Sequence, residues 1–139
     1  MVPELDGIDH VHVYVQNREK AAVWYEKILG FKISESLAFW AKDSHGPLTI
    51  EDSAGKIHLA LFTNDNFTPS TAIAFRANGE SFLEWKTLLE NKKILLRCTD
   101  HTVAWSLYFN DLDGNMHEIT TYHYDYVSEH LSSLKPAEG

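Results

Sequence analysis

The stretch from Phe109 to Ile119 reads FNDLDGNMHEI and has the pattern of a β-hairpin. Strand-forming residues lead into the turn Asp-Leu-Asp-Gly-Asn, and a second strand leaves it. Asp and Asn hydrogen-bond their own backbone in turns, and Gly supplies the positive φ that a tight reversal requires. On the outgoing strand Met116, Glu118 and Thr120 share one face. A carboxylate there is costly to bury unless it is paired or ligating, so we expect Glu118 to form one wall of a small-molecule or metal pocket.

Outward from this hairpin, the order strand-helix-strand-strand-strand occurs twice along the chain, at an offset of about 62 residues. Alternating apolar residues mark the strands, and apolar residues at helical spacing mark the helices. Asn17 has the position of a helix N-cap, and Gly30 that of a left-handed C-cap. In the first half we expect strands at 8–15 and 56–62, a helix at 18–29, and short strand candidates at 31–36, 39–43 and 48–52. In the second half we expect strands at 71–77, 94–98, 103–109 and 116–122 around a helix at 80–91.

The repeat predicts an α+β fold built from two βαβββ modules, at 7–63 and 70–122. A length of 139 residues suits a single domain, which we place at 1–139. Apolar residues at helical spacing after the last strand predict a C-terminal helix at 123–134. We expect residues 136–139 to fray.

Composition excludes several classes of function. The formal net charge of −8 argues against nucleic-acid binding and against binding to an anionic membrane surface, because both need a basic surface. No apolar run is long enough for a membrane span, and the N-terminus lacks the order of a signal peptide. Cys98 is the single cysteine, so no intrachain disulfide can form and a reducing cytoplasm is the simplest location. We interpret Cys98 as a structural residue of a strand.

Three motifs, in this order, carry a resemblance to a known family. Residues 9–17 read DHVHVYVQN, residues 22–31 read AVWYEKILGF, and residues 107–118 read LYFNDLDGNMHE. Over residues 7 to 122 the chain resembles the vicinal oxygen chelate superfamily, which includes glyoxalase I, fosfomycin-resistance and bleomycin-resistance proteins and extradiol dioxygenases. Leu112 stands where the family usually has Pro. The resemblance implies one glyoxalase-like domain whose two modules form a cupped mixed sheet, often closed by dimerisation, and hence a homodimer.

The resemblance also implies where a metal would bind. Enzymes of this family take ligands from the first, fourth, fifth and eighth strands, which here correspond to His10, His58, Ala72 and Glu118. Alanine cannot ligate, so the expected set is His10, His58 and Glu118, around a divalent Fe, Mn, Ni, Co or Zn ion. Glu118 would also be the catalytic residue that moves protons. His12 lies on the same strand face as His10 and could replace His10 or His58 as a ligand, or support His10 by orienting it.

Three functions follow from this resemblance. The first is a metal-dependent enzyme that chelates vicinal oxygens of a small-molecule substrate, with lyase, dioxygenase, isomerase and transferase chemistry all open. The second is a metal-free protein that binds a small molecule, as bleomycin-resistance proteins do. The third is a dimeric module that serves a partner protein and has no ligand.

Of the remaining histidines, we expect His117 to point away from Glu118 and His101 to lie in a loop. The aromatic residues that could line an apolar cavity are Trp40, Phe62, Phe75, Trp105 and Tyr108.

Overall fold

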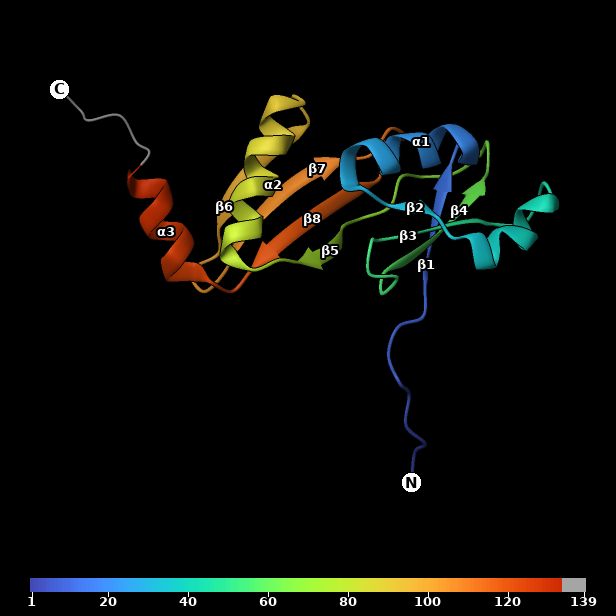
Figure 1. Cartoon of the computed structure of the whole chain (residues 1–139), viewed down its shortest axis with the longest axis horizontal. Helices are drawn as coiled ribbons and strands as arrows, with labels where there is room; N and C mark the ends of the chain where they lie inside the picture. Colours follow the sequence, from blue (N-terminus) through green and yellow to red (C-terminus); the bar gives the residue numbers. More distant parts are fainter. Residues whose placement is uncertain (134–139) are drawn as a thin grey trace. The chain divides into compact units, whose positions relative to one another are not determined.

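The chain forms two compact units in a computed structural model that describes residues 1–133 (Figure 1). The first unit contains residues 1–70 and 111–114, and the second contains residues 71–110 and the chain from Asn115 onward. The last residue of the expected C-terminal helix, 134, and the expected frayed end at 136–139 lie outside the described residues. The single-domain organisation stays a prediction.

The first unit is a four-stranded mixed sheet with a helix against it. The sheet has the order β1-β4-β3-β2; β1 runs parallel to β4, and the other pairs are antiparallel. The helix α1 packs against β2, β3 and β4. A 3₁₀ helix, η1, lies between β2 and β3 and contacts β3. The elements are β1 (Val11–Val15), α1 (Arg18–Leu29), β2 (Lys32–Ile33), η1 (Glu35–Lys42), β3 (Leu48–Glu51) and β4 (His58–Thr63).

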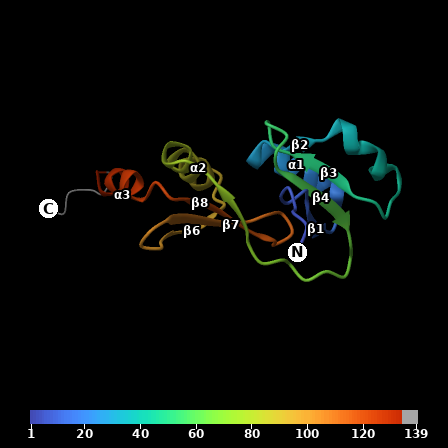
Figure 2. The same cartoon turned by 90° about the horizontal axis from the view of Figure 1, so that it is seen from below.

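The second unit repeats this topology. Its sheet has the order β5-β8-β7-β6, again with one parallel pair, β5 and β8. The helix α2 lies over the sheet, and α3 packs against α2 (Figure 2). The elements are β5 (Ile73–Arg76), α2 (Gly79–Asn91), β6 (Leu95–Asp100), β7 (Trp105–Asn110), β8 (Met116–Thr121) and α3 (Tyr124–Ser133). The predicted α+β class, with two βαβββ modules and a C-terminal helix, is confirmed. None of the helices within residues 1–133 is long and apolar enough to cross a membrane.

The ends of α1 form as its sequence predicts. The side chain of Asn17 accepts a hydrogen bond from the backbone N–H of Lys20, which satisfies one of the free donors at the helix start. Gly30 ends the helix at φ +73°, a conformation that favours glycine. The buried face of the helix then packs on the sheet. Its buried apolar residues are Ala21, Ala22, Tyr25, Ile28 and Leu29.

One buried hydrogen bond joins α1 to the turn that precedes β8. The hydroxyl of Tyr25 donates to Oδ2 of Asp111 over 2.6 Å. Burial, and next the nearby charge of Asp111, raise the pKa of Tyr25 far above its usual value, so the hydroxyl keeps its proton. In the same turn Asp113 accepts a hydrogen bond from the backbone N–H of Gln16 over 3.0 Å. Gly114 has φ +85°, as the hairpin pattern predicted.

The strand expected at 39–43 is wrong, because residues 35–42 form the 3₁₀ helix η1. Short apolar runs do not distinguish the two structures. Here the carbonyl groups of Ala41, Asp43 and Gly46 accept hydrogen bonds from the side chain of Arg18, so they are not available to a neighbouring strand. The segment also folds back tightly, because a Cβ at Gly46 would lie 2.2 Å from the carbonyl oxygen of Trp40.

Candidate functional site

Two of the predicted ligands, His10 and His58, line one cavity of about 230 Å³ in the first unit. The parallel register of β1 and β4 explains this arrangement. Val11 pairs with Leu59, so the residue before each of them, His10 and His58, lies at the same level of the sheet. The register is itself set by the buried residues Val13 and Val15, which are 1% and 0% exposed. The other lining residues are Asp9, Leu37, Trp40, Pro47, Thr49 and Ala60.

The ring of His10 is held on both of its nitrogens. Nδ1 lies 2.7 Å from Oδ2 of Asp9, and Nε2 lies 3.0 Å from Nε2 of His12. A carboxylate on one ring nitrogen fixes the tautomer and leaves the lone pair on the other nitrogen, which is the usual arrangement of a metal-binding histidine. The rings of His10 and His12 are 22° from parallel, with centroids 4.9 Å apart. The ring of His12 also packs against Phe62, at a centroid distance of 4.7 Å.

His58 faces the cavity but already has a partner. Its Nε2 lies 3.0 Å from Oε2 of Glu51, the residue directly opposite it on β3. Both side chains are partly shielded from solvent, at 24% and 30% exposure. An ion could therefore reach His58 through Nδ1, or through Nε2 after the contact with Glu51 breaks.

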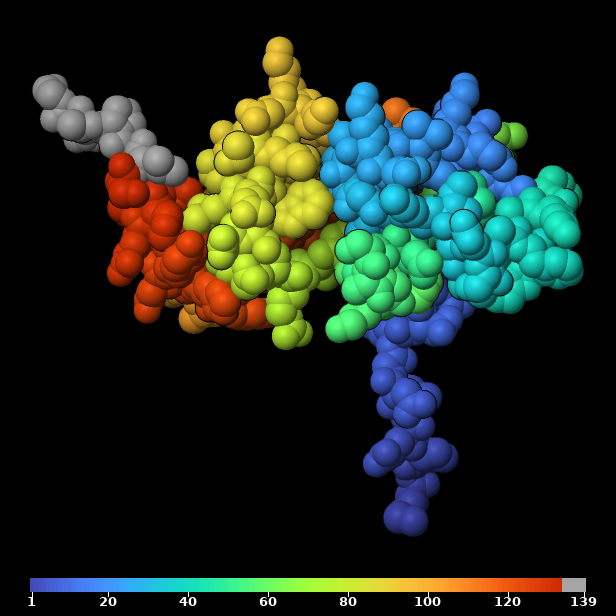
Figure 3. Space-filling model, in the orientation of Figure 1, coloured from blue at the N-terminus to red at the C-terminus, as the bar shows by residue number. Residues whose placement is uncertain are grey.

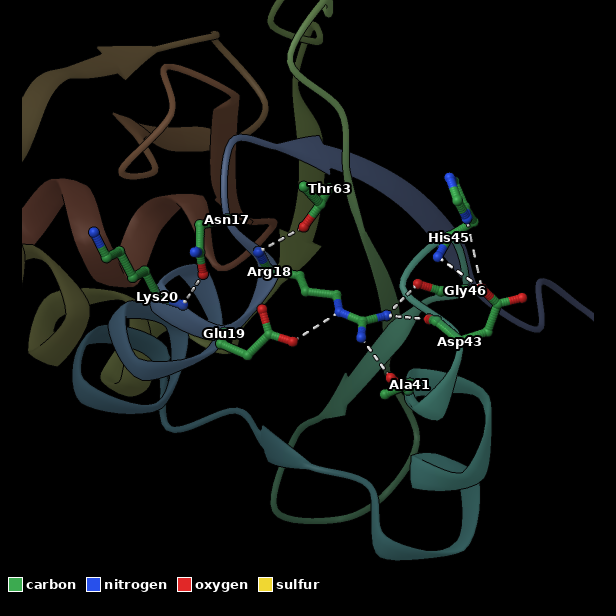
Figure 4. Close-up of polar contacts among 9 residues, drawn as sticks. All are labelled: Asn17, Arg18, Glu19, Lys20, Ala41, Asp43, His45, Gly46 and Thr63. Carbon is green, nitrogen blue, oxygen red and sulfur yellow. Dashed lines mark hydrogen bonds and ion pairs between the residues drawn. The ribbon is translucent and has the colours of Figure 1, made fainter.

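The outer wall of this cavity comes from η1, which contributes Leu37 and Trp40. The buried side chain of Arg18 holds the segment in place (Figure 4). Its Nη1 donates to the carbonyl oxygens of Asp43 and Gly46, and its Nη2 donates to that of Ala41. The guanidinium also pairs with Glu19 over 2.8 Å. In the space-filling view the η1 segment stands out in cyan at the edge of the first unit (Figure 3).

The third predicted ligand, Glu118, lines a cavity of about 450 Å³ in the second unit. Its Oε2 accepts hydrogen bonds from Oγ of Ser106 over 2.7 Å and from Oγ1 of Thr120 over 2.5 Å. Within residues 1–133, Oε1 accepts no hydrogen bond from a side chain, so it is the oxygen that a ligand can use. As predicted, His117 lies on the opposite face of β8, where it is fully buried. The other lining residues are Ala74, Phe75, Arg76, His101, Val103, Ala104 and Tyr122.

Charged and aromatic groups surround Glu118 on this sheet. Tyr108 pairs with Glu118 across β7 and β8 and with Arg97 across β6 and β7. The guanidinium of Arg97 lies over the Tyr108 ring, 4.2 Å from its centroid. His101, which precedes the turn into β7, has Nε2 at 2.9 Å from the Tyr108 hydroxyl. Arg76 and His101 both line the cavity.

The three predicted ligands, two imidazoles and one carboxylate, are of types that a divalent ion takes. His10 and His58 belong to the first unit and Glu118 to the second. Within residues 1–133, no three His, Cys, Asp or Glu side chains form a group that could hold a metal ion. Ala72, at the position that corresponds to the fifth-strand ligand, offers no donor atom. His10 fits best, because its Nδ1 is held by a carboxylate while its Nε2 faces another ring nitrogen.

Sequence patterns did not identify two lining residues of the Glu118 cavity, Ser106 and Thr120, nor Arg18, which holds the η1 segment. An arginine in the first turn of a helix is usually exposed, and only the tertiary fold shows which carbonyl groups it binds. Ser106 and Thr120 could have been found from the hairpin register, since they are cross-strand neighbours beside Glu118. Cys98 lies in β6 as expected, and burial raises the pKa of its thiol, which favours the unreactive protonated form.

Comparison with known proteins assigns the fold to a family. Residues 7–119 match the model of the Glyoxalase/Bleomycin resistance protein/Dioxygenase superfamily. The chain is 31% identical to the metallothiol transferase FosB of Staphylococcus haemolyticus over 146 aligned positions, which cover 96% of this chain and 94% of FosB. Similar solved structures include a protein of Bacillus anthracis assigned to the glyoxalase family (TM-score 0.72, 22% identity, 88% of this chain and 99% of that one).

A further structural neighbour is the fosfomycin resistance protein FosX of Listeria monocytogenes, solved with Mn(II) and 1S,2S-dihydroxypropylphosphonic acid (TM-score 0.70, 15% identity, 88% of this chain and 97% of that one). At these identities the solved structures support the fold alone. The family model, together with the nearly full-length likeness to FosB, places the chain by sequence as well. The chain belongs to the glyoxalase/bleomycin resistance protein/dioxygenase superfamily.

Proposed function

We propose that the protein is a metal-dependent enzyme that chelates vicinal oxygens of a small-molecule substrate on a divalent ion bound by His10, His58 and Glu118. The observation that carries this proposal is the convergence of His10 and His58 on one cavity, from neighbouring parallel strands. Two imidazoles and one carboxylate are a common ligand set for such ions, and they leave positions open for a substrate. The bound ion would act as a Lewis acid that stabilises negative charge on a substrate oxygen.

The residues of the chain have distinct tasks in this proposal. Asp9 orients His10 through Nδ1. Ser106 and Thr120 hold one oxygen of Glu118, so that the other oxygen is positioned for the ion or for a proton of the substrate. Arg76 and His101 line the same cavity as Glu118 and favour a substrate that carries an anionic group.

Thiol transfer is the first reaction to test, because the relative that aligns over nearly the full chain is named a metallothiol transferase. The assay mixes the protein, Mn²⁺, fosfomycin and a small thiol, and measures the loss of free thiol with time. Consumption that depends on both the metal and the protein supports a transferase. A metal-bound protein that consumes no thiol under these conditions would leave the metal site in place and exclude this reaction.

A second candidate, a metal-free protein that binds a small molecule, has one observation in its favour. Nε2 of His58 is hydrogen-bonded to Glu51, and the alanine at position 72 has no donor atom. Fewer groups are therefore available to bind a metal ion than in relatives with a histidine at that position. In that case the two cavities would bind an organic ligand without any ion. Chelator-treated protein would then keep its full affinity for that ligand.

Metal content separates the two candidates. The untagged protein is purified, and its bound metal is measured beside that of His10→Ala, His58→Ala and a control, His45→Ala. His45 lies in the same unit with a side chain 95% exposed and does not line the cavity. We expect about one ion per chain in the wild type and the control, and loss of the ion in the other two variants. A wild type that holds no metal, and whose thermal midpoint no divalent ion raises, would contradict the proposal, because a bound ion must stabilise the native state.

A further inference from the structure

We infer that His12 is a ligand of the same ion, so that His10, directly before β1, and His12, within β1, supply two imidazoles to one metal. This inference rests on the proposed function, and it adds the imidazole that the alanine at position 72 cannot provide. The site would select ions that favour nitrogen ligands, such as Co²⁺, Ni²⁺ or Zn²⁺, over Mg²⁺ and Ca²⁺, which favour oxygen.

The spacing of the two residues is suited to a shared ion. Residues at i and i+2 of a strand point to the same face and lie about 6.6 Å apart along it. In the structure the Nε2 atoms of His10 and His12 lie 3.0 Å apart. Bonds of about 2.1 Å from one ion to two nitrogens at a right angle place those nitrogens about 3.0 Å apart, and a tetrahedral angle places them about 3.4 Å apart. The two Nε2 atoms are therefore already at the separation that two ligands of one ion require.

The side chains of Asp9 and Phe62 hold the rings of His10 and His12 close together. Asp9 lies 2.7 Å from Nδ1 of His10, which places a proton there and leaves the Nε2 lone pair facing His12. Phe62 packs against the His12 ring and limits its rotation. With both rings neutral and the His10 proton on Nδ1, His12 donates its Nε2 proton to His10 in this contact. To ligate through Nε2, His12 would have to carry its proton on Nδ1 instead, a change of tautomer that contact with solvent allows.

Nε2 of His12 already lies beside Nε2 of His10, whereas Nε2 of His58 faces Glu51. Nε2 of His58 is bonded to Glu51, so an ion must use its other nitrogen or break that contact. The His10 side chain is 43% exposed, and His12 is also exposed, so an ion reaches the pair directly from solvent. His12 is not a lining residue of the cavity that His10 and His58 share, which places the ion at the rim of that cavity beside β1.

The test measures Co²⁺ affinity of the full chain by titration, from the visible absorption of the bound ion. The variants are His12→Ala and His12→Phe, where phenylalanine keeps a ring against Phe62 and removes both nitrogens. His10→Ala is the positive control and His45→Ala the matched negative control. A two-dimensional NMR spectrum of the imidazole nitrogens, recorded with and without Zn²⁺, gives a readout that does not depend on activity. We expect both His12 variants to weaken binding by at least about 10-fold, the lower end of the loss seen for groups that only support a ligand.

The outcomes separate this inference from the proposed function. Weak binding by both His12 variants, together with a shift of the His12 Nε2 resonance on Zn²⁺ binding, supports the inference. If His10→Ala loses the ion while both His12 variants bind within about twofold of wild type, the inference is wrong and the proposed metal site stands. If the wild type binds no Co²⁺ or Zn²⁺, both are wrong.

Discussion

Glu118 has two different oxygens, and this difference sets what its replacement should do. Oε2 is engaged by Ser106 and Thr120, and a glutamine oxygen can accept the same two hydrogen bonds. The Glu118→Gln variant should therefore keep its fold and lose a negative ligand. We expect metal affinity to fall at least about 10-fold, while the thermal midpoint of the metal-free protein stays close to wild type. Ion titration and thermal unfolding measure the two effects.

A Glu118→Gln variant that unfolds far below the wild type would show that the carboxylate mainly stabilises the sheet. The double change Ser106→Ala and Thr120→Val tests the other side of the same contact. It removes both donors from Oε2, so we expect weaker ion binding with Glu118 still in place. Unchanged ion affinity in this double variant would contradict the role given to the two hydroxyl groups.

For single residues, the sequence predicted where a side chain lies better than which groups it contacts. The hairpin pattern identified Glu118 and its face of β8, since alternation along a strand is a local property. The contact between His58 and Glu51 could not be predicted, because it depends on the register of β3 against β4. Nor could the convergence of His10 and His12 at 3.0 Å, which depends on rotamers that Asp9 and Phe62 restrict.

Among the elements, η1 should depend on the single side chain of Arg18. Lysine keeps the charge and loses the planar fork that reaches three carbonyl groups. We expect Arg18→Lys to lower the free energy of unfolding by at least about 1.5 kcal/mol, the lower end for a hydrogen bond to a charged group. The segment 35–46 should also become a site of rapid proteolysis. Lys20→Ala, on the exposed side of the same helix, is the control; equal cleavage rates in the two variants would refute this role for Arg18.

The attachment of α1 to the turn at 111–114 should depend on the hydroxyl of Tyr25. Phenylalanine fits the same space and removes the donor to Asp111, so we expect Tyr25→Phe to lose roughly 1.5–3 kcal/mol of unfolding free energy. Burial and Asp111 raise the pKa of Tyr25 in the folded state above the unfolded value of about 10. The stabilisation is thus fully present below pH ~10 and is lost as the pH rises further. Urea unfolding of both proteins between pH 7 and pH 10.5 should show a constant difference that shrinks only at the alkaline end.

The elements themselves were largely predictable, with η1 as the instructive exception. The caps Asn17 and Gly30 and the apolar spacing between them define α1 locally, and the structure has it at the predicted residues. In η1, by contrast, the decisive contacts come from Arg18, which is distant in sequence. A local pattern cannot report that three carbonyl groups will be bound by a buried guanidinium.

In the whole molecule, the two units share one topology but differ in chemistry. The first carries the imidazoles and the second the carboxylate and the arginines around it. The first unit also includes residues 111–114, which lie between two paired strands of the second. We expect this shared hairpin to make unfolding a single cooperative transition, with tryptophan fluorescence and far-ultraviolet circular dichroism following the same curve. Two separated transitions would contradict the single-domain prediction.

The turn at 111–114 also has a consequence for synthesis. The strands and the helix of the first unit are complete once Thr63 has been made, but Asp111, the hydrogen-bond acceptor for Tyr25, is added 48 residues later. A nascent chain halted on the ribosome before this turn emerges would hold α1 without its buried acceptor. The first half of the protein should therefore resist protease fully only when the turn has left the exit tunnel, even though it is translated first.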